Sequence, residues 1–123
     1  MTETPKGGRR VLVVEDEAII SLALADTLEG AGYTVAGPFG TRSETLSWLE
    51  ANTPDLALLD VKLKDGSSDD IARELAQRGV PFVVQSGHHR QPQASPELRR
   101  APWLEKPTPQ ADLLQMLGSL QAA

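Results

Sequence analysis

The sequence predicts an α/β protein in which five strand–helix pairs build a parallel sheet. Short apolar runs alternate along the chain with stretches in which apolar residues recur every three or four positions. This is the pattern of strands followed by helices, and glycine and proline separate most of the segments. A chain of 123 residues can bury one hydrophobic core. We therefore expect one domain over residues 9–123, preceded by a loose polar tail, residues 1–8.

The first strand–helix pair begins with an apolar run, residues 11–14, that is too short for anything but a buried strand. Ile20, Leu24 and Leu28 then recur every four residues on one helical face, and two glycines end the helix. A second, short strand is expected over residues 33–36.

Capping signals mark the next two helices. Residues 41–44, Thr-Arg-Ser-Glu, match a capping box and predict a helix that ends before Pro54. A buried strand follows over residues 56–59. Residues 67–70 then form a second box-like start, and the helix after them is expected to stop at Gly79.

The last part of the chain is less regular. A strand is predicted over residues 82–84, and prolines then limit any helix to about residues 95–100. A fifth strand is expected to end at Lys106, and Thr108-Pro109 starts a closing helix. The apolar stripe of that helix consists of Leu113, Met116, Leu117 and Leu120.

Composition excludes several classes of function. Without cysteine the chain can form neither a disulfide nor a thiolate metal site. Twelve basic and 17 acidic residues give a net charge of -5, which opposes attraction to nucleic acid and to anionic membranes. No apolar run approaches the roughly 18 residues of a membrane span, and the polar N-terminus lacks a secretory signal. We expect a cytoplasmic protein without a nucleic-acid partner and without membrane insertion.

Polar residues follow the predicted strands at the point where each strand ends. Glu15 and Asp16 come after the first strand, Asp60 after the third and Ser86 after the fourth. Parallel strands bring these ends to one edge of the sheet, where open α/β sheets bind ligands. Carboxylates ionised near neutral pH repel one another, so a cation is expected between them. An all-oxygen ligand set favours a hard ion such as Mg²⁺ that shares a phosphate oxygen.

Two further side chains would suit a phosphoryl group. Lys106 adds a positive charge after the fifth strand, and Ser86 adds a hydroxyl donor. Together with Mg²⁺ they could neutralise a phosphoryl group in transit to Asp60. Asp60 would then be the nucleophile and would form an aspartyl phosphate.

This ordered set resembles the response-regulator receiver domains of two-component signalling, over the chain from about Arg9 onward. The matching residues are, in chain order, Glu15, Asp16, Asp60, Ser86, Lys106 and Pro107. The resemblance implies a flavodoxin-like, doubly wound sheet of five parallel strands in the order 2-1-3-4-5, with helices on both faces.

The resemblance also implies the chemistry of the site. Asp60 would accept the phosphoryl group from a histidine kinase or a histidine phosphotransfer protein. Glu15, Asp16, Asp60 and the backbone carbonyl of Lys62 would serve the Mg²⁺ site, and Lys106 would pair with the phosphate.

A receiver also switches. By the resemblance, Ser86 would swing to bind the phosphate, and Trp103 stands at the position of an aromatic residue that changes rotamer with phosphorylation. The Lys106–Pro107 peptide would be cis. Lys62 and His88 lie where receivers tune the lifetime of the phosphate.

The chain departs from the common receiver pattern at two places. Lys64 stands where many receivers carry a proline, and Asp65-Gly66 follow it. The segment 85–87, Gln-Ser-Gly, and the proline-broken helix after it are similar to a single-domain subgroup of bacterial stress and light signalling. Kinases of the histidine-tryptophan-glutamate class often serve that subgroup.

Each residue also has an ordinary structural interpretation. Asp16 could cap the first helix, Asp60 could be a solvated turn residue, and Trp103 could be ordinary packing. Ser86 and Lys106 could be a loop hydroxyl and a surface amine. Their joint placement at successive strand ends favours the functional interpretation.

We therefore expect a stand-alone receiver, not an enzyme beyond its own phosphorylation and dephosphorylation, that passes its signal by contact with an unidentified downstream protein. A phosphate sink or shuttle that drains a kinase is the alternative. A phosphohydrolase of the haloacid-dehalogenase type fits less well, because Lys62 stands where those enzymes carry a second aspartate. A phosphorylation-independent binding module is the remaining possibility.

Overall fold

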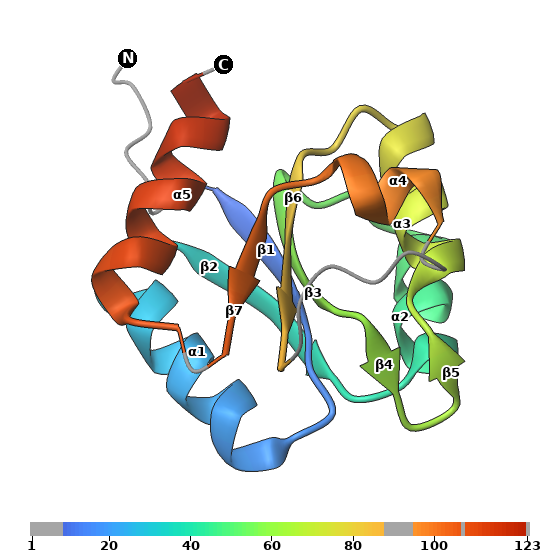
Figure 1. Ribbon diagram of the computed structural model, residues 1–123, viewed down its shortest axis with the longest axis horizontal. Coiled ribbons are helices and arrows are strands. Elements are labelled where there is room, and N and C mark those ends of the chain that lie inside the picture. The colour runs from blue at the N-terminus through green and yellow to red at the C-terminus, as the bar shows by residue number, and fades with distance from the viewer. Residues whose placement is uncertain (1–8, 88–94, 107, 123) are drawn as a thin grey trace.

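The fold was analysed in a computed structural model, which describes residues 9–87, 95–106 and 108–122 (Figure 1). The predicted tail, residues 1–8, His88 and the Lys106–Pro107 peptide lie outside the described residues. The elements, in chain order, are β1 (Arg10–Val14), α1 (Ala18–Gly30), β2 (Thr34–Phe39), α2 (Arg42–Leu49), β3 (Leu56–Asp60), β4 (Lys62–Leu63), β5 (Gly66–Ser67), α3 (Asp69–Gln77), β6 (Phe82–Ser86), α4 (Pro96–Arg100), β7 (Trp103–Glu105) and α5 (Gln110–Ala122).

A five-stranded parallel sheet forms the centre of the molecule, which confirms the predicted fold class. Its strand order is β2-β1-β3-β6-β7. This is the expected order 2-1-3-4-5 once the two short strands β4 and β5, which pair only with each other, are set aside. Every neighbouring pair in the large sheet is parallel.

Two helical layers cover the sheet. Because successive side chains of a strand point to opposite faces, Val11 and Val13 of β1 pack on one side, and Leu12 and Val14 pack on the other. The first side is closed by α1 and α5, and the second by α2, α3 and α4 (Figure 1). Most of β1 and all of β3 are buried, as expected for central strands covered on both faces.

Two predicted helix starts are confirmed by their caps. Thr41 Oγ1 accepts a hydrogen bond from the Glu44 amide over 3.1 Å at the start of α2. Ser95 Oγ accepts one from the Leu98 amide over 3.3 Å at the start of α4. The helix end predicted at Gly79 is also present, with α3 ending at Gln77.

The capping box predicted at residues 67–70 is wrong. The residue before α3 is Ser68, whose side chain makes no capping hydrogen bond. Ser67 belongs to β5 instead, where its hydroxyl accepts from the Asp69 amide over 3.3 Å. Pairing with β4 takes Ser67 away from the position that a box requires.

The second strand is longer than predicted, since β2 continues past residue 36 to Phe39. The strand bends at Gly37, and Phe39 returns to pair with Val14. Gly37 has a φ of 96°, and a Cβ there would lie only 2.8 Å from the Phe39 amide nitrogen. Only glycine fits this bend, because any side chain would clash with the backbone of the returning strand.

A small hairpin between β3 and α3 was not predicted. It consists of β4 and β5, lies beside α2 in Figure 1, and directly follows Asp60. Among the described helices, none has both the length and the apolar composition that a membrane span requires.

Candidate functional site

The carboxyl edge of the sheet carries a pocket of about 260 Å³. Its lining consists of Asp16, Glu17, Asp60, Val61, Lys62, Ser86, Gly87 and Lys106. All but Lys62, which begins β4, come from the ends of β1, β3, β6 and β7, which are neighbours in the sheet. Because the strands are parallel, segments that are far apart in the sequence deliver their polar residues to one place.

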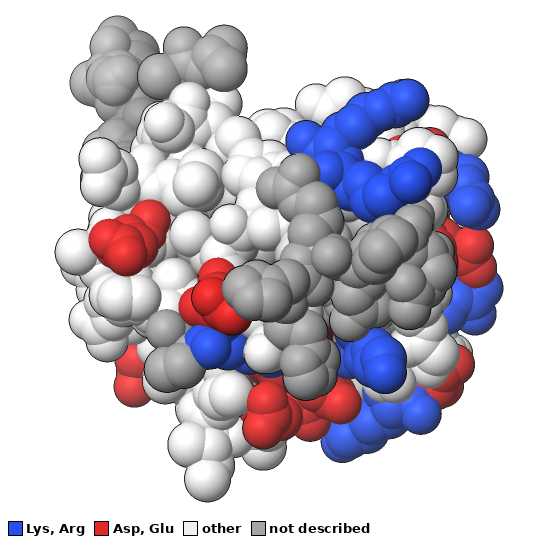
Figure 2. Space-filling model, viewed as in Figure 1, with Lys and Arg blue, Asp and Glu red and all other residues white. Residues whose placement is uncertain are grey.

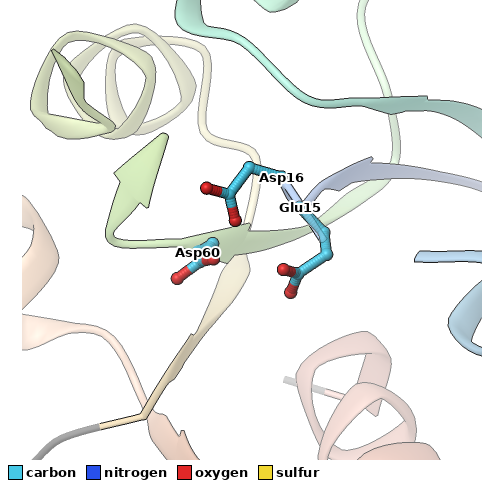
Figure 3. Close-up of side chains that lie close together, drawn as sticks. All are labelled: Glu15, Asp16 and Asp60. Carbon is cyan, nitrogen blue, oxygen red and sulfur yellow. The ribbon is translucent and has the colours of Figure 1, made fainter. Parts of the chain in front are cut away.

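Three carboxylates meet beside this pocket (Figure 3). Glu15, Asp16 and Asp60 each offer a carboxylate oxygen, and these oxygens lie within 4.8 Å of one another. Asp16 points toward Asp60 in the close-up, while Glu15 approaches from the end of β1. Glu15 is 3% exposed and Asp60 is 9% exposed, so water screens their repulsion poorly.

Lys106 supplies the counter-charge. Its ammonium donates to Asp60 Oδ2 over 3.0 Å and forms an ion pair with Glu15 Oε1 at 2.8 Å. The other oxygen of Glu15 accepts from the Glu17 amide over 3.1 Å, which holds that side chain in place. One ammonium cannot neutralise three carboxylates. The remaining negative charge and the all-oxygen donors fit a hard divalent cation.

The surroundings of Asp60 favour its protonated form. Burial of the carboxyl, followed by the charge of Glu15, raises the pKa of Asp60 to about 6, although the hydrogen bond from Lys106 acts in the opposite direction. Burial by itself would lower the pKa of Lys106. The contacts with Glu15 and Asp60 outweigh that effect, so the pKa of Lys106 is raised and the ammonium stays charged.

The remaining predicted residues take different places. Ser86 is the last residue of β6, is 3% exposed and lines the pocket, and its carbonyl accepts from the Lys106 amide over 2.8 Å. Lys62 also lines the pocket. Trp103 is not part of it. The indole Nε1 of Trp103 instead donates to the Leu98 carbonyl over 2.6 Å, which ties β7 to α4.

Two ordinary interpretations do not describe the structure. Glu17, rather than Asp16, occupies the position before α1, and it makes no side-chain cap. Asp60 is buried and bonded to Lys106, so it is not a solvated turn residue.

Glu17 is a pocket residue that the sequence analysis did not select. It lines the pocket, and its Oε1 lies 3.7 Å from Lys106 Nζ. The signal was present in the run Glu15-Asp16-Glu17. Only the first two acids of that run were assigned to the site, because the third also suits the start of a helix.

Comparisons with known proteins agree with this geometry. The family model described as "Response regulator receiver domain" matches residues 11–118. The transcriptional regulatory protein PdtaR of Mycobacterium tuberculosis is 40% identical over 77 residues, which are 62% of this chain and 38% of PdtaR. The phyllosphere-induced regulator PhyR of Methylorubrum extorquens is 41% identical over 59 residues, 47% of this chain and 22% of PhyR. The chain thus spans well under half the length of either relative.

Solved structures are similar over nearly the whole chain. The solution structure of SdrG from Sphingomonas melonis Fr1 is 32% identical, with a TM-score of 0.77 and coverage of 92% of this chain and 96% of that one. A receiver domain protein from Methanospirillum hungatei has a TM-score of 0.80 at 26% identity, covering 90% and 91% of the two chains. The parallel sheet, the acidic pocket at its carboxyl edge and these matches all agree, and the chain belongs to the response regulator receiver domain family of two-component signalling.

Proposed function

We propose that this chain is a receiver that accepts a phosphoryl group on Asp60 from a histidine kinase or a histidine phosphotransfer protein, with Mg²⁺, and passes the signal to another protein by contact. The main support is that Asp60 lies next to both the Lys106 ammonium and two further carboxylates. The match with SdrG, 32% identical and similar over 96% of that chain, supports the assignment as a receiver.

Asp60 would act as the nucleophile. One of its oxygens attacks the phosphorus of a phosphohistidine, a P–O bond forms, the P–N bond breaks, and the imidazole leaves with the electron pair and takes up a proton. With a pKa of about 6, roughly nine in ten Asp60 carboxyls are ionised at pH 7. Lys106 and Ser86 line the same pocket and would donate to the transferred oxygens.

Mg²⁺ would be held by Glu15, Asp16, Asp60 and the backbone carbonyl of Lys62. The fit rests on the cluster of oxygens within 4.8 Å and on the negative charge that Lys106 leaves uncompensated. When bound, the ion would neutralise phosphoryl oxygens as charge develops on them. It would also favour ionised Asp60 over the protonated form that burial promotes.

The phosphodonor protein would dock on α1. Ile19 and Leu22 are 84% and 65% exposed and lie three residues apart on one face of this helix, so they form a small exposed apolar patch. Ile19 also lines a groove of about 250 Å³ between α1 and α5, and this groove reaches Lys106 at the edge of the phosphoacceptor pocket. A donor helix on this surface would lie next to Asp60.

The charge of the surface formed by α1 and α5 indicates which kind of donor helix would bind there. Neither α1 nor α5 contains Lys or Arg. Figure 2 shows basic side chains gathered on the side of α2, α3 and α4, whereas the side of α1 and α5 is mostly uncharged or acidic. We infer a donor helix with an apolar stripe and basic flanks.

Incubation with Mg²⁺ and acetyl phosphate, followed by intact-mass measurement, tests the proposal. The parent protein should gain one phosphoryl group, and Asp60→Asn should gain none. Asp55→Asn is a matched control, since Asp55 comes directly before the first residue of β3, at the opposite end of the strand from Asp60. Equal labelling of the parent and Asp60→Asn, or no labelling under conditions that label a known receiver, would contradict the assignment of Asp60.

The same samples separate a signalling receiver from a phosphate sink. After the donor is removed, the decay of the phosphorylated mass gives the lifetime of the phosphoaspartate. A sink should lose its phosphate quickly, whereas a signalling receiver must keep it long enough to find a partner.

A further inference from the structure

A short hairpin follows Asp60, and its first residue reaches the candidate site. The hairpin consists of β4 and β5, and Lys62 at its start lines the pocket. The Ser68 amide donates to the Val61 carbonyl over 2.9 Å, which closes the hairpin next to Asp60. The place of Lys62 in the pocket therefore depends on how the hairpin is held.

Asp65, at the tip of the hairpin, is bonded to the start of α2. Its Oδ1 accepts from the Arg42 amide over 2.6 Å, and its Oδ2 accepts from the Ser43 amide over 3.0 Å. The first amides of a helix have no acceptor within the helix, so both bonds satisfy donors that would otherwise need water. These bonds hold the pKa of Asp65 below its usual range, and the carboxylate stays charged near the positive end of the helix.

A second contact joins α2 to the exit of the hairpin. The Arg42 guanidinium forms an ion pair with Asp70, which lies in the first turn of α3. Arg42 thus contacts the chain on both sides of β5, through its amide and through its side chain. The cap that Thr41 provides for the Glu44 amide is local to α2 and does not involve the hairpin.

We infer that Asp65 is a positioning residue for the cation site: by bonding the hairpin to α2 it fixes Lys62 beside Asp60, and it couples cation binding to the first turn of α2. The inference rests on the proposed function, because it takes the Lys62 carbonyl as a ligand. The coupling runs through contiguous bonded segments, from Asp60 through the closed hairpin to the Asp65 carboxylate.

A competing interpretation makes Asp65 only a helix cap. Leu63 of β4 is 7% exposed and packs in the core, so it alone could hold the hairpin. In that case loss of the Asp65 carboxylate would lower the stability of α2 and leave the affinity for Mg²⁺ unchanged. The two interpretations therefore differ in a quantity that can be measured.

The first test is a titration of the full chain with Mg²⁺, in which the NMR signals of the pocket amides report binding. Asp65→Ala should weaken Mg²⁺ binding about tenfold, a typical loss when a group that orients a ligand is removed. Asp65→Asn keeps one acceptor oxygen and should lose less. Asp55→Ala is the matched control: Asp55 Oδ2 accepts from the Arg10 amide over 2.8 Å, away from the pocket, and this variant should bind Mg²⁺ like the parent.

The second test uses only the parent protein, so its result does not depend on whether a variant folds. If Mg²⁺ binding is coupled to the Asp65 hydrogen bonds, linkage requires that bound Mg²⁺ stabilise these bonds by the same factor by which the bonds strengthen Mg²⁺ binding. Saturating Mg²⁺ should slow hydrogen exchange of the Arg42 and Ser43 amides about tenfold. The Glu44 amide, bonded to Thr41 in the same turn, should change little.

The outcomes separate this inference from the proposed function. Mg²⁺ binding by the parent with unchanged affinity in Asp65→Ala, or with unchanged exchange at Arg42 and Ser43, overturns the role of Asp65 and leaves the phosphoacceptor site intact. A parent that binds no Mg²⁺ overturns both.

Discussion

At the residue scale, the burial of the Asp60 carboxylate suits a phosphoacceptor and costs the folded protein some stability. Burial and the charge of Glu15 raise its pKa to about 6. The carboxylate is therefore ionised at neutral pH in surroundings that destabilise its charge. Lys106 offsets part of that cost through its hydrogen bond to Asp60. Shifted pKa values of this kind cluster at functional sites.

Asp60→Asn should therefore stabilise the folded protein at neutral pH in the absence of divalent ions. The pKa of Asp60 rises from 3.8 in the unfolded chain to about 6 in the folded one. The folded state thus binds the proton more tightly, and the parent loses stability as the pH rises through this window. The gain at pH 7.5 should be about 1–2 kcal/mol after allowance for solvent screening.

Urea unfolding at pH 7.5 and at pH 4 measures this effect. The gain should be much smaller at pH 4, because the folded carboxyl is then protonated and the unfolded one, with a pKa of 3.8, is close to its midpoint. Asp55→Asn should show no gain at either pH, because its carboxylate accepts a stabilising hydrogen bond from the Arg10 amide. An Asp60→Asn variant less stable than the parent at pH 7.5 would show that the Lys106 bond outweighs burial.

Lys106→Ala should separate phosphate uptake from the response to it. Without the ammonium, Glu15 and Asp60 face each other uncompensated, and the variant should lose about 3 kcal/mol of stability without Mg²⁺. With Mg²⁺ it should still gain the phosphoryl mass, since Asp60 and Asp16 remain.

The phosphate-dependent shift of the Trp103 indole NMR signal should be lost in Lys106→Ala, because the group that contacts the phosphate is gone. Lys64→Ala removes an exposed lysine of the hairpin loop and should behave like the parent. An unchanged indole shift in phosphorylated Lys106→Ala would contradict the proposed role of Lys106.

At the element scale, α4 depends on its neighbours more than on itself. It has only five residues, fewer than an isolated helix needs, and one of them, Leu98, is fully buried. The Asp69 carboxylate accepts from the Ser95 amide over 3.0 Å at one end, and the Trp103 indole donates to the Leu98 carbonyl at the other. The Trp103 side chain thus links the strand that leads to Lys106 with α4.

Trp103→Phe should loosen α4 without unfolding the domain. The phenyl ring keeps most of the packing but cannot donate to the Leu98 carbonyl, and such a bond contributes about 1 kcal/mol. Hydrogen exchange of the Ala101 amide, which donates to Leu98 at the end of α4, should become about fivefold faster. Trp48→Phe, on α2, should leave this amide unchanged, and equal effects of the two variants would argue against the tie.

At the scale of the whole molecule, the two helical layers differ in chemistry. The layer of α1 and α5 lacks basic residues within its helices and exposes Ile19 and Leu22, and Ile19 lines the groove that reaches Lys106. The other layer carries the hairpin contacts and the basic side chains seen in Figure 2. A donor and a downstream partner can therefore recognise different sides of one small protein.

The double variant Ile19→Ser, Leu22→Ser tests the donor side. Both side chains are exposed, so stability should change by less than about 0.5 kcal/mol per site. Phosphorylation by acetyl phosphate should be unchanged, whereas transfer from a phosphorylated histidine kinase should fall at least tenfold, about 1.4 kcal/mol of binding.

Glu29→Ser, near the far end of α1, serves as the control for this variant and should keep both reactions. Equal transfer from the kinase to the parent and to the double variant would place the donor on another surface.

Much of the fold follows from short-range sequence signals. The central strands, the caps at Thr41 and Ser95 and the helix end at Gly79 were predictable, because hydrophobic periodicity and capping chemistry act over a few residues. The end of β2 was not, since its return to β1 after Gly37 depends on a backbone approach between two strands. The hairpin after Asp60 was also missed, because strands of two residues carry no periodicity.

For the site, the sequence by itself determined which residues stand at the ends of the strands, and it thereby selected Glu15, Asp16, Asp60, Ser86 and Lys106. Only the tertiary structure decided that Lys106 bridges Glu15 and Asp60, that Asp60 titrates near pH 6, and that Asp65 bonds to α2. The reason is physical: periodicity and capping are properties of neighbouring residues, whereas ion pairing and desolvation depend on distances that exist only after the chain has folded.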